Sequence, residues 1–207
     1  MNKVSIRLPC HTQVVLASGS PRRRELLERI GMPFSVLPSQ AEEHIPFGLS
    51  PSMAVESLSL LKAADVAKSQ PKETLVIGAD TVVVLDDEIL TKPKDAEDAK
   101  CMLRRLSGRC HSVLTGLTVI RCGDGKSVSV CEETKVYCKP LTENEITAYV
   151  DTKEPLDKAG SYGIQGLGGL FIQKIEGDYY NVVGLPLARL SQLLKEEFDI
   201  ELIWEVL

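Results

Sequence analysis

The stretch QVVLASGSPRRRELLERIG, residues 13–31, carries the pattern on which the fold assignment rests. Residues 13–17 form a short β-branched and aliphatic run of the kind that builds strands. Ser18-Gly19-Ser20-Pro21 interrupts this run, and apolar residues then recur at helical spacing until Gly31. Ser20 can cap the helix, with Pro21 as its first residue. The stretch therefore predicts a strand, a turn and a helix.

Strands and helices alternate along the rest of the chain. Strands are expected at 34–37, 75–78, 82–85, 89–90, 113–121, 128–137, 170–175 and 179–183, and helices at about 51–68, 95–106, 142–150 and 187–198. The apolar residues of the glycine-rich segment 157–169 follow neither the helical nor the strand spacing. No repeat, linker or low-complexity segment divides the chain. Helices interspersed with strands, some of them joined as hairpins, predict an α/β fold with a mixed sheet.

Composition limits the classes of function. The 207 residues include 24 Lys and Arg against 29 Asp and Glu, for a net charge of −5. Because a nucleic-acid binder normally needs a basic face, this balance argues against a polymeric polyanion as partner. The apolar runs fall short of the roughly 18 residues of a membrane span. Residues 1–11 contain no apolar core of a secretory signal, so we expect a cytoplasmic protein with six reduced cysteines.

Residues 18–23 combine features of an anion site. A helix start offers unpaired backbone N–H groups, and Ser18 and Ser20 add hydroxyls. Arg22 and Arg23 add guanidinium groups, whose planar fork can bond two phosphate oxygens at once. By itself, such a stretch is more often a capped helix that carries a solvated basic turn.

Asp80 is the most conspicuous acidic residue, because it ends an apolar run between Ala79 and Thr81. A carboxylate is costly to bury without a partner, and carboxylates at strand ends often hold a metal or activate water. The alternative is an aspartate that caps a turn.

Other polar residues have weaker signals. Lys62 and Lys92 can neutralise phosphates, and Glu42 and Glu43 can add metal ligands, although each is also compatible with a solvated surface position. The segment 157–160 (DKAG), together with Gln165, can bring backbone close to a ligand and offer an amide to a base edge; its alternative is a surface loop.

Taken together, these segments resemble a known family. SGSPRR, GADT, KP, LSGR, DKAGSYGIQGLGG and GDYYNVVGLPL occur in this order over residues 13–199, as in the Maf family of nucleoside triphosphate pyrophosphatases. The resemblance implies a mixed twisted sheet flanked by helices, with two lobes and a deep cleft, related to inosine triphosphate pyrophosphatases. It also implies hydrolysis of a nucleotide to its monophosphate and pyrophosphate with Mg²⁺ or Mn²⁺, commonly by a homodimer.

The resemblance assigns roles to individual residues. Asp80 matches the catalytic carboxylate regarded as the proton acceptor, and Arg23, Thr81 and Gln165 match three positions linked to substrate choice. GADT with GIQG is similar to the subfamily that prefers dTTP and UTP over 7-methyl-GTP. The remaining matches to positions that line the family's cleft are Ser18, Arg22, Lys62, Lys92, Asp157 and Lys158.

Two parts of the chain depart from the family pattern. The residues before Lys62, at positions 57–61, lack the charged neighbour often found there, which weakens the assignment of Lys62. Residues 1–12 lie outside the resemblance and are expected to be a poorly ordered leader ahead of a single domain over 13–207.

These matches lead to a mechanistic hypothesis. Arg22, Arg23, Lys62 and Lys92 hold phosphates, and Asp80, with Glu42 or Glu43, binds a divalent ion and positions or deprotonates water. Removal of non-canonical pyrimidine nucleotides is the cellular role implied. Two alternatives stay open: a nucleotide-binding regulator of cell division without turnover, and a phosphatase that cleaves the β–γ bond.

Overall fold

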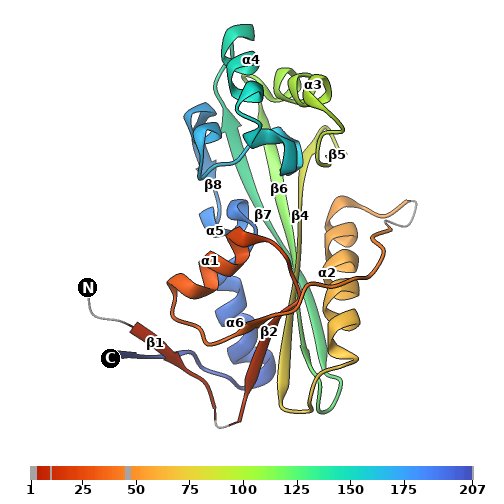
Figure 1. The fold of residues 1–207 in the computed structure, drawn as a ribbon, viewed down its shortest axis with the longest axis vertical. Helices are drawn as coiled ribbons and strands as arrows, with labels where there is room; N and C mark the ends of the chain where they lie inside the picture. The colour runs from red at the N-terminus through yellow and green to blue at the C-terminus, as the bar shows by residue number, and fades with distance from the viewer. Residues whose placement is uncertain (1–3, 10, 45–47, 207) are drawn as a thin grey trace. The chain divides into compact units, whose positions relative to one another are not determined.

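The computed structural model describes residues 4–9, 11–44 and 48–206 (Figure 1). Its strands are β1 (Val4–Arg7), β2 (Gln13–Leu16), β3 (Ser35–Val36), β4 (Thr74–Leu85), β5 (Glu88–Leu90), β6 (Cys110–Arg121), β7 (Ser127–Cys138), β8 (Ile172–Glu176) and β9 (Ile203–Val206). Its α-helices are α1 (Pro21–Arg29), α2 (Pro51–Ala67), α3 (Ala96–Leu106), α4 (Glu143–Asp151), α5 (Tyr179–Val183) and α6 (Leu187–Phe198). Three short 3₁₀ helices are Glu154–Asp157, Ala159–Ser161 and Leu167–Phe171.

The mixed α/β prediction is confirmed. The main sheet has seven strands in the order β3-β2-β4-β6-β7-β8, and β5 pairs with β4. β2 runs parallel to both β3 and β4, whereas β4–β5 and β7–β8 are antiparallel. No helix among the described residues is long and apolar enough to cross a membrane.

Three predicted strands differ most from the structure. The segments 75–78 and 82–85 belong to one continuous strand, β4, so Asp80 lies within a strand and not at its end. Residues 179–183 form helix α5 and not the second strand of a hairpin. Tyr and Val favour strands, but Asp178 Oδ1 accepts a hydrogen bond from the Tyr180 N–H at 2.7 Å. Buried Asn181 also donates to the Val113 carbonyl at 3.0 Å, and these contacts outweigh local propensity.

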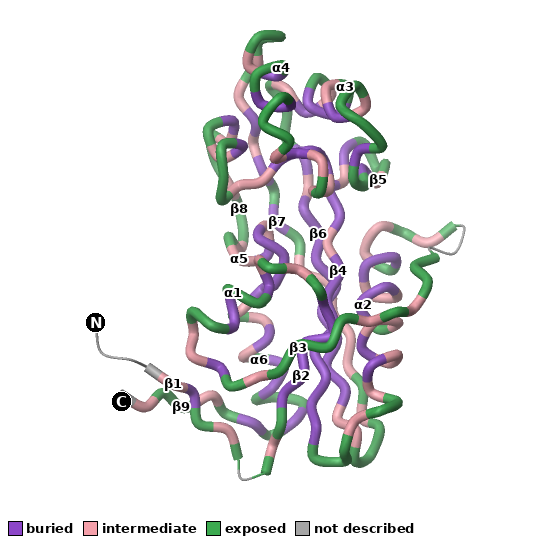
Figure 2. The backbone as a smooth tube through the Cα atoms, in the orientation of Figure 1, coloured by how far each residue is buried: buried purple, intermediate pink, exposed green. Residues whose placement is uncertain are grey.

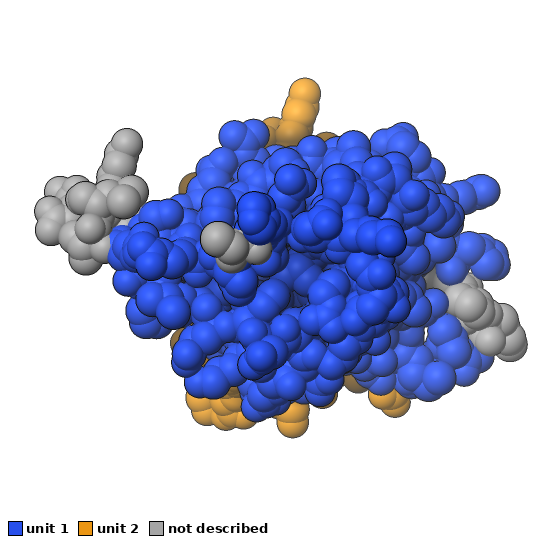
Figure 3. Space-filling view, turned by 90° about the horizontal axis from the view of Figure 1, so that it is seen from below, with its two compact units in different colours: residues 1–80, 115–132, 184–207 blue, residues 81–114, 133–183 orange. Residues whose placement is uncertain are grey.

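The chain divides into two compact units, coloured in Figure 3. Unit 1 comprises Met1–Asp80, Thr115–Glu132 and Gly184–Leu207, and unit 2 comprises Thr81–Leu114 and Glu133–Val183. Each has an apolar core, and the buried residues lie along the strands and on the helices (Figure 2). The deep cleft implied by the family resemblance stays a prediction.

Residues 4–7, expected to belong to a poorly ordered leader, form strand β1. β1 pairs antiparallel with β9, with Ile6 opposite Trp204. Ile6 is buried, and its N–H donates to the Gly31 carbonyl at 2.9 Å. Residues 1–3 and 10 of that leader lie outside the described residues.

Helix α2 packs unusually close to the sheet in unit 1. A Cβ atom added to Gly78 of β4 would lie 2.3 Å from the Ser59 carbonyl oxygen, and one added to Gly116 of β6 would lie 2.0 Å from the Val55 carbonyl oxygen. Real Cβ atoms do not approach other atoms this closely, so only glycine fits at either position. The helix backbone therefore rests directly on two strands.

The core of unit 2 contains a buried polar pair. His111 Nε2 and the Tyr162 hydroxyl are 2.8 Å apart, and both side chains are buried. Burial lowers the pKa of His111 to about 4, so the imidazole is neutral at physiological pH. His111 is thus a core residue.

The close approach of α2 gives a first prediction. Gly78→Ala should lower the free energy of unfolding by about 2 kcal/mol, because backbone atoms of Ser59 and Ala63 must move to admit the methyl group. Urea unfolding of the wild type and the variant measures this difference.

Gly19→Ala is the matched control for stability. A Cβ at Gly19 would meet only side-chain atoms of Pro38, at 3.7 and 3.8 Å, which is ordinary contact. Equal urea midpoints for Gly78→Ala and Gly19→Ala would show that α2 does not rest on β4 as described.

Candidate active site

The register between β2 and β4 brings the first two sequence motifs together in unit 1. Leu16, the last residue of β2, pairs with Ile77 of β4, and the Ala17 N–H donates to the Ile77 carbonyl at 2.8 Å. β4 then continues beyond the end of β2, and Asp80 lies on this extension. The chain that leaves β2 passes through Ser18 into α1, so the start of α1 and Asp80 both lie beyond the last pair of residues that joins β2 to β4.

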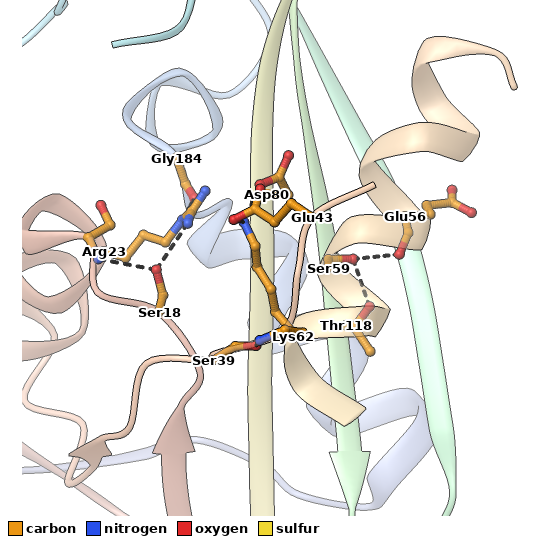
Figure 4. A network of polar contacts seen from close by, with 12 residues as sticks. Ser18, Arg23, Ser39, Glu43, Glu56, Ser59, Lys62, Asp80, Thr118 and Gly184 are labelled. Carbon is orange, nitrogen blue, oxygen red and sulfur yellow. Dashed lines mark hydrogen bonds and ion pairs between the residues drawn. The ribbon is translucent and has the colours of Figure 1, made fainter. Parts of the chain in front are cut away.

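Lys62 connects two carboxylates (Figure 4). Its Nζ lies 2.5 Å from Asp80 Oδ1 and 3.0 Å from Glu43 Oε1. The side chains of Lys62 and Asp80 are 13% and 12% exposed, whereas Glu43 is 55% exposed. Lys62 is the weaker assignment from the sequence, yet it is ion-paired with Asp80. The site is thus a largely buried ion pair with one acidic group on its solvent side.

Arg23 is buried at the start of α1, where its fork is held by the protein. Its Nε donates to the Gly184 carbonyl at 2.7 Å, and its Nη1 donates to Ser18 Oγ at 3.0 Å. Ser18 Oγ also accepts from the Ser20 N–H at 3.2 Å. Pro21 begins the helix as predicted, but Ser20 makes no side-chain capping bond. Ser18, and not Ser20, therefore organises the turn.

Electrostatics links Arg23 to the carboxylates. Burial lowers the pKa of Arg23, and the positive charge of Arg22 adds to this effect. The negative charges of Asp80 and Glu43 raise the pKa of Arg23 and so offset part of the effect of burial. Arg22, Arg23, Glu43, Lys62 and Asp80 therefore form one charged cluster in unit 1.

Arg24 and Glu42, which flank members of this cluster in the sequence, have other surroundings. Arg24 points to solvent and pairs with Glu28 at 2.7 Å, one helical turn away. Glu42 is exposed, and the contact to Lys62 comes from its neighbour Glu43. The acidic pair thus contributes its second member to the cluster.

Sequence reasoning missed the residue that fixes the loop before Glu43. Asp65 Oδ2, one turn after Lys62 on α2, accepts from Ser39 Oγ at 2.8 Å and from the Gln40 N–H at 2.9 Å. These hydrogen bonds lower the pKa of Asp65. The spacing of three residues puts Lys62 and Asp65 on one helix face, but it does not predict that Asp65 binds the loop.

Unit 2 contains the remaining predicted site residues. Thr81 follows Asp80 on β4, and exposed Lys92 follows Thr91, whose carbonyl accepts from the Gly160 N–H at 3.1 Å. Lys158 Nζ lies 2.6 Å from Asp157 Oδ1. Gln165 is exposed in the glycine-rich loop. Within this unit the structure therefore joins the Lys92 loop to the 157–160 segment.

The unit 1 cluster suits a divalent ion in part. Asp80 and Glu43 each lie within hydrogen-bond distance of the same ammonium group, so their carboxylates are near each other. Mg²⁺ is commonly held by one or two carboxylates, with substrate phosphates and water completing its shell. No group of three or more acidic, His or Cys side chains that could hold a metal occurs in the described part of the chain. The residues therefore fit an ion that is bound together with a phosphate ligand.

Comparison with known proteins gives a consistent result. The family model described as "Maf-like protein" matches residues 13–197. A dTTP/UTP pyrophosphatase from Thermoanaerobacter sp. (strain X514) is 53% identical over 191 residues, which cover 92% of this chain and 100% of the relative. One from Bacillus cytotoxicus (strain DSM 22905 / CIP 110041 / 391-98 / NVH 391-98) is 54% identical over 185 residues, which cover 89% of this chain and 95% of that protein.

Solved structures also include matches to this chain. The Staphylococcus aureus Ham1 protein matches with a TM-score of 0.44 and 14% identity, over 61% of this chain and 72% of its own. A likeness at this level carries no argument about function. The family model, together with relatives that share more than half of their residues with this sequence over most of its length, shows that the chain belongs to the Maf family.

Proposed function

We propose that this chain hydrolyses dTTP and UTP to the monophosphate and pyrophosphate. The relatives named dTTP/UTP pyrophosphatase are matched over nearly their whole length. The observation that carries the proposal is the contact between Lys62 and Asp80 at 2.5 Å, with Glu43 and Arg23 in the same cluster. This cluster supplies both a basic oxygen and the positive charge that phosphoryl transfer requires.

The reaction is proposed at the α-phosphorus. A water oxygen forms a bond to this phosphorus while the bond to the α–β bridging oxygen breaks, and pyrophosphate leaves with that oxygen. Lys62 contacts Asp80 Oδ1, which orients the carboxylate so that Oδ2 can accept the proton or hold the water. Arg22, Arg23, Lys62 and Lys92 offset the negative charge of the phosphates.

A divalent cation is part of the proposal. Asp80 and Glu43, rather than Glu42, are the protein groups that would hold Mg²⁺ or Mn²⁺. When bound, such an ion supplies charge neutralisation and lowers the pKa of coordinated water. An ion held by these two carboxylates would balance their charge, the Lys62 ammonium would then be available to a phosphate oxygen, and Asp80 would keep its role at the water.

Substrate choice is assigned to unit 2. Gln165 and Thr81, with Arg23 of unit 1, match the family positions linked to specificity, and the exposed amide of Gln165 can both donate to and accept from a pyrimidine edge. The proposed partner is the nucleotide alone, without nucleic acid or membrane, and the proposed location is the cytoplasm. Homodimer formation and removal of modified pyrimidine nucleotides are proposed on the family resemblance alone.

A regulator that binds nucleotides without turnover is the second candidate. Such a regulator would use the same cluster, but nucleotide binding without turnover does not require a carboxylate next to the lysine proposed to contact the phosphates. The intact Lys62–Asp80 pair therefore favours the enzyme.

The role of Asp80 gives a second prediction. Asp80→Asn should reduce kcat for dTTP by at least about a hundred-fold, because the amide cannot accept the proton from water. Pyrophosphate release in the presence of Mg²⁺ measures this loss. Asp80→Glu keeps the charge beside Lys62 but displaces the oxygens, and it should also be strongly impaired.

The matched control is Asp86→Asn. Asp86 is ion-paired with Arg109 at 2.6 Å and exposed, and its positive φ of 53° suits asparagine. This variant should retain wild-type turnover. Near-wild-type turnover by folded Asp80→Asn would refute the assignment of Asp80.

Base selection gives a third prediction. The wild type should favour dTTP and UTP over dATP and GTP, since a site built for a pyrimidine edge leaves its polar groups unpaired against a purine. Gln165→Ala should lower kcat/KM for dTTP about tenfold and dATP less, because one neutral hydrogen bond is lost. Comparable kcat/KM values for all four nucleotides would contradict this account.

A further inference from the structure

The side chain of Glu154 lies beneath the glycine-rich loop at residues 163–169 in unit 2. Its Oε2 accepts a hydrogen bond from the Leu167 N–H at 3.0 Å. Its Oε1 accepts from the Gly168 N–H at 3.3 Å and from the Tyr149 hydroxyl at 3.0 Å. The Tyr149 oxygen accepts in turn from the Gly163 N–H at 3.1 Å. One carboxylate thus holds both ends of the loop, directly and through Tyr149.

These contacts explain two of the glycines of this loop, Gly166 and Gly168. A Cβ at Gly166 would lie 2.4 Å from Glu154 Oε1, and one at Gly168 would lie 2.7 Å from the Tyr149 hydroxyl oxygen. The loop backbone therefore rests on the Glu154 and Tyr149 side chains without space for a methyl group. The shape of the loop is set by what lies beneath it.

Gln165 lies at the turn that this arrangement creates. The Gly166 N–H donates to the Gly163 carbonyl at 3.2 Å, which closes the backbone around residues 164 and 165. Ile164 packs against the core of unit 2, whereas Gln165 is exposed. The direction of the Gln165 amide therefore depends on the backbone beneath it and on the groups that hold that backbone.

The surroundings of Glu154 favour its ionised form. Burial alone would raise its pKa, but hydrogen bonds from the Leu167 and Gly168 N–H groups and from Tyr149, together with the charge of Lys158, lower it. Hydrogen bonds to an ionised carboxylate are about twice as strong as neutral ones. The ionised form is therefore the one that fixes the loop at neutral pH.

We propose that Glu154 is a positioning residue for base recognition, which holds the 163–169 loop in the shape that presents Gln165 to the pyrimidine. The inference rests on the proposed function for the identity of the substrate. It assigns to Glu154 a contribution to the choice between pyrimidine and purine, and no contact with the reacting phosphorus.

The test measures discrimination by binding, so that turnover is not needed. Calorimetry with the α,β-methylene analogues of dTTP and dATP, in the presence of Mg²⁺, gives the ratio of their Kd values. Glu154→Ala should reduce the preference for the dTTP analogue about tenfold. Glu154→Gln should lose less, because its amide oxygen still accepts one N–H. Glu143→Gln is the control, since Glu143 is an exposed acid of the same unit that is paired with Arg104 at 2.8 Å.

A double-mutant cycle separates positioning from a general structural role. If Glu154 acts through Gln165, Glu154→Ala should change the ratio in the wild type and leave it unchanged in a Gln165→Ala background. Effects of the two substitutions that multiply would overturn the proposal, as would an unchanged ratio in Glu154→Ala. If Glu154→Ala does not fold, Tyr149→Phe removes the hydroxyl bridge and should shift the ratio in the same direction.

Failure of the proposed function would be recognised separately. A wild type that prefers the dTTP analogue but releases no pyrophosphate from dTTP would end the catalytic proposal and leave the role of Glu154 supported. A wild type that binds both analogues equally would overturn the inference, because there would be no preference for the pyrimidine that Glu154 could support.

Discussion

The charged cluster depends on one packing constraint, the contact between the backbone of α2 and two strands of the sheet. Gly78 and Gly116 lack the Cβ atoms that would collide with the Ser59 and Val55 carbonyl oxygens. Two residues further along each strand, on the same face, a polar side chain meets the helix. Asp80 follows Gly78 and pairs with Lys62, and Thr118 follows Gly116 and lies 2.7 Å from Ser59 Oγ.

The contact between α2 and the sheet brings Lys62 and Asp80 together as a largely buried ion pair, at the position proposed for catalysis. Removing two charges from water is expensive, and removing either partner of such a buried pair leaves the other uncompensated. The cost is tolerated here because Glu43 and Arg23 complete a network in which cations and carboxylates alternate. An acidic chain can hold a triphosphate in this way, since only a few cations need to be gathered at one place.

Much of this was predictable from the sequence because the signals are local. The helix that begins at Pro21 follows from residues close in the chain, and the structure confirms it. The i,i+4 pair of Arg24 with Glu28 and the capping box of Thr142 with Glu145 are local features of the same kind. The continuity of β4 through Asp80 was not predictable. A carboxylate in an apolar run indicates the end of a strand, unless its ion-pair partner on another element is known. The roles of Asp65 and Glu154 were hidden for the same reason: each binds backbone N–H groups, which have no sequence signature.

The most direct test of the account is the position of the bond that breaks. dTTP is hydrolysed with Mg²⁺ in water labelled with heavy oxygen, and the products are separated and weighed by mass spectrometry. Attack at the α-phosphorus, next to the Lys62–Asp80 pair, predicts dTMP that carries the label and pyrophosphate that does not. Label in pyrophosphate, or formation of dTDP and phosphate, would contradict it.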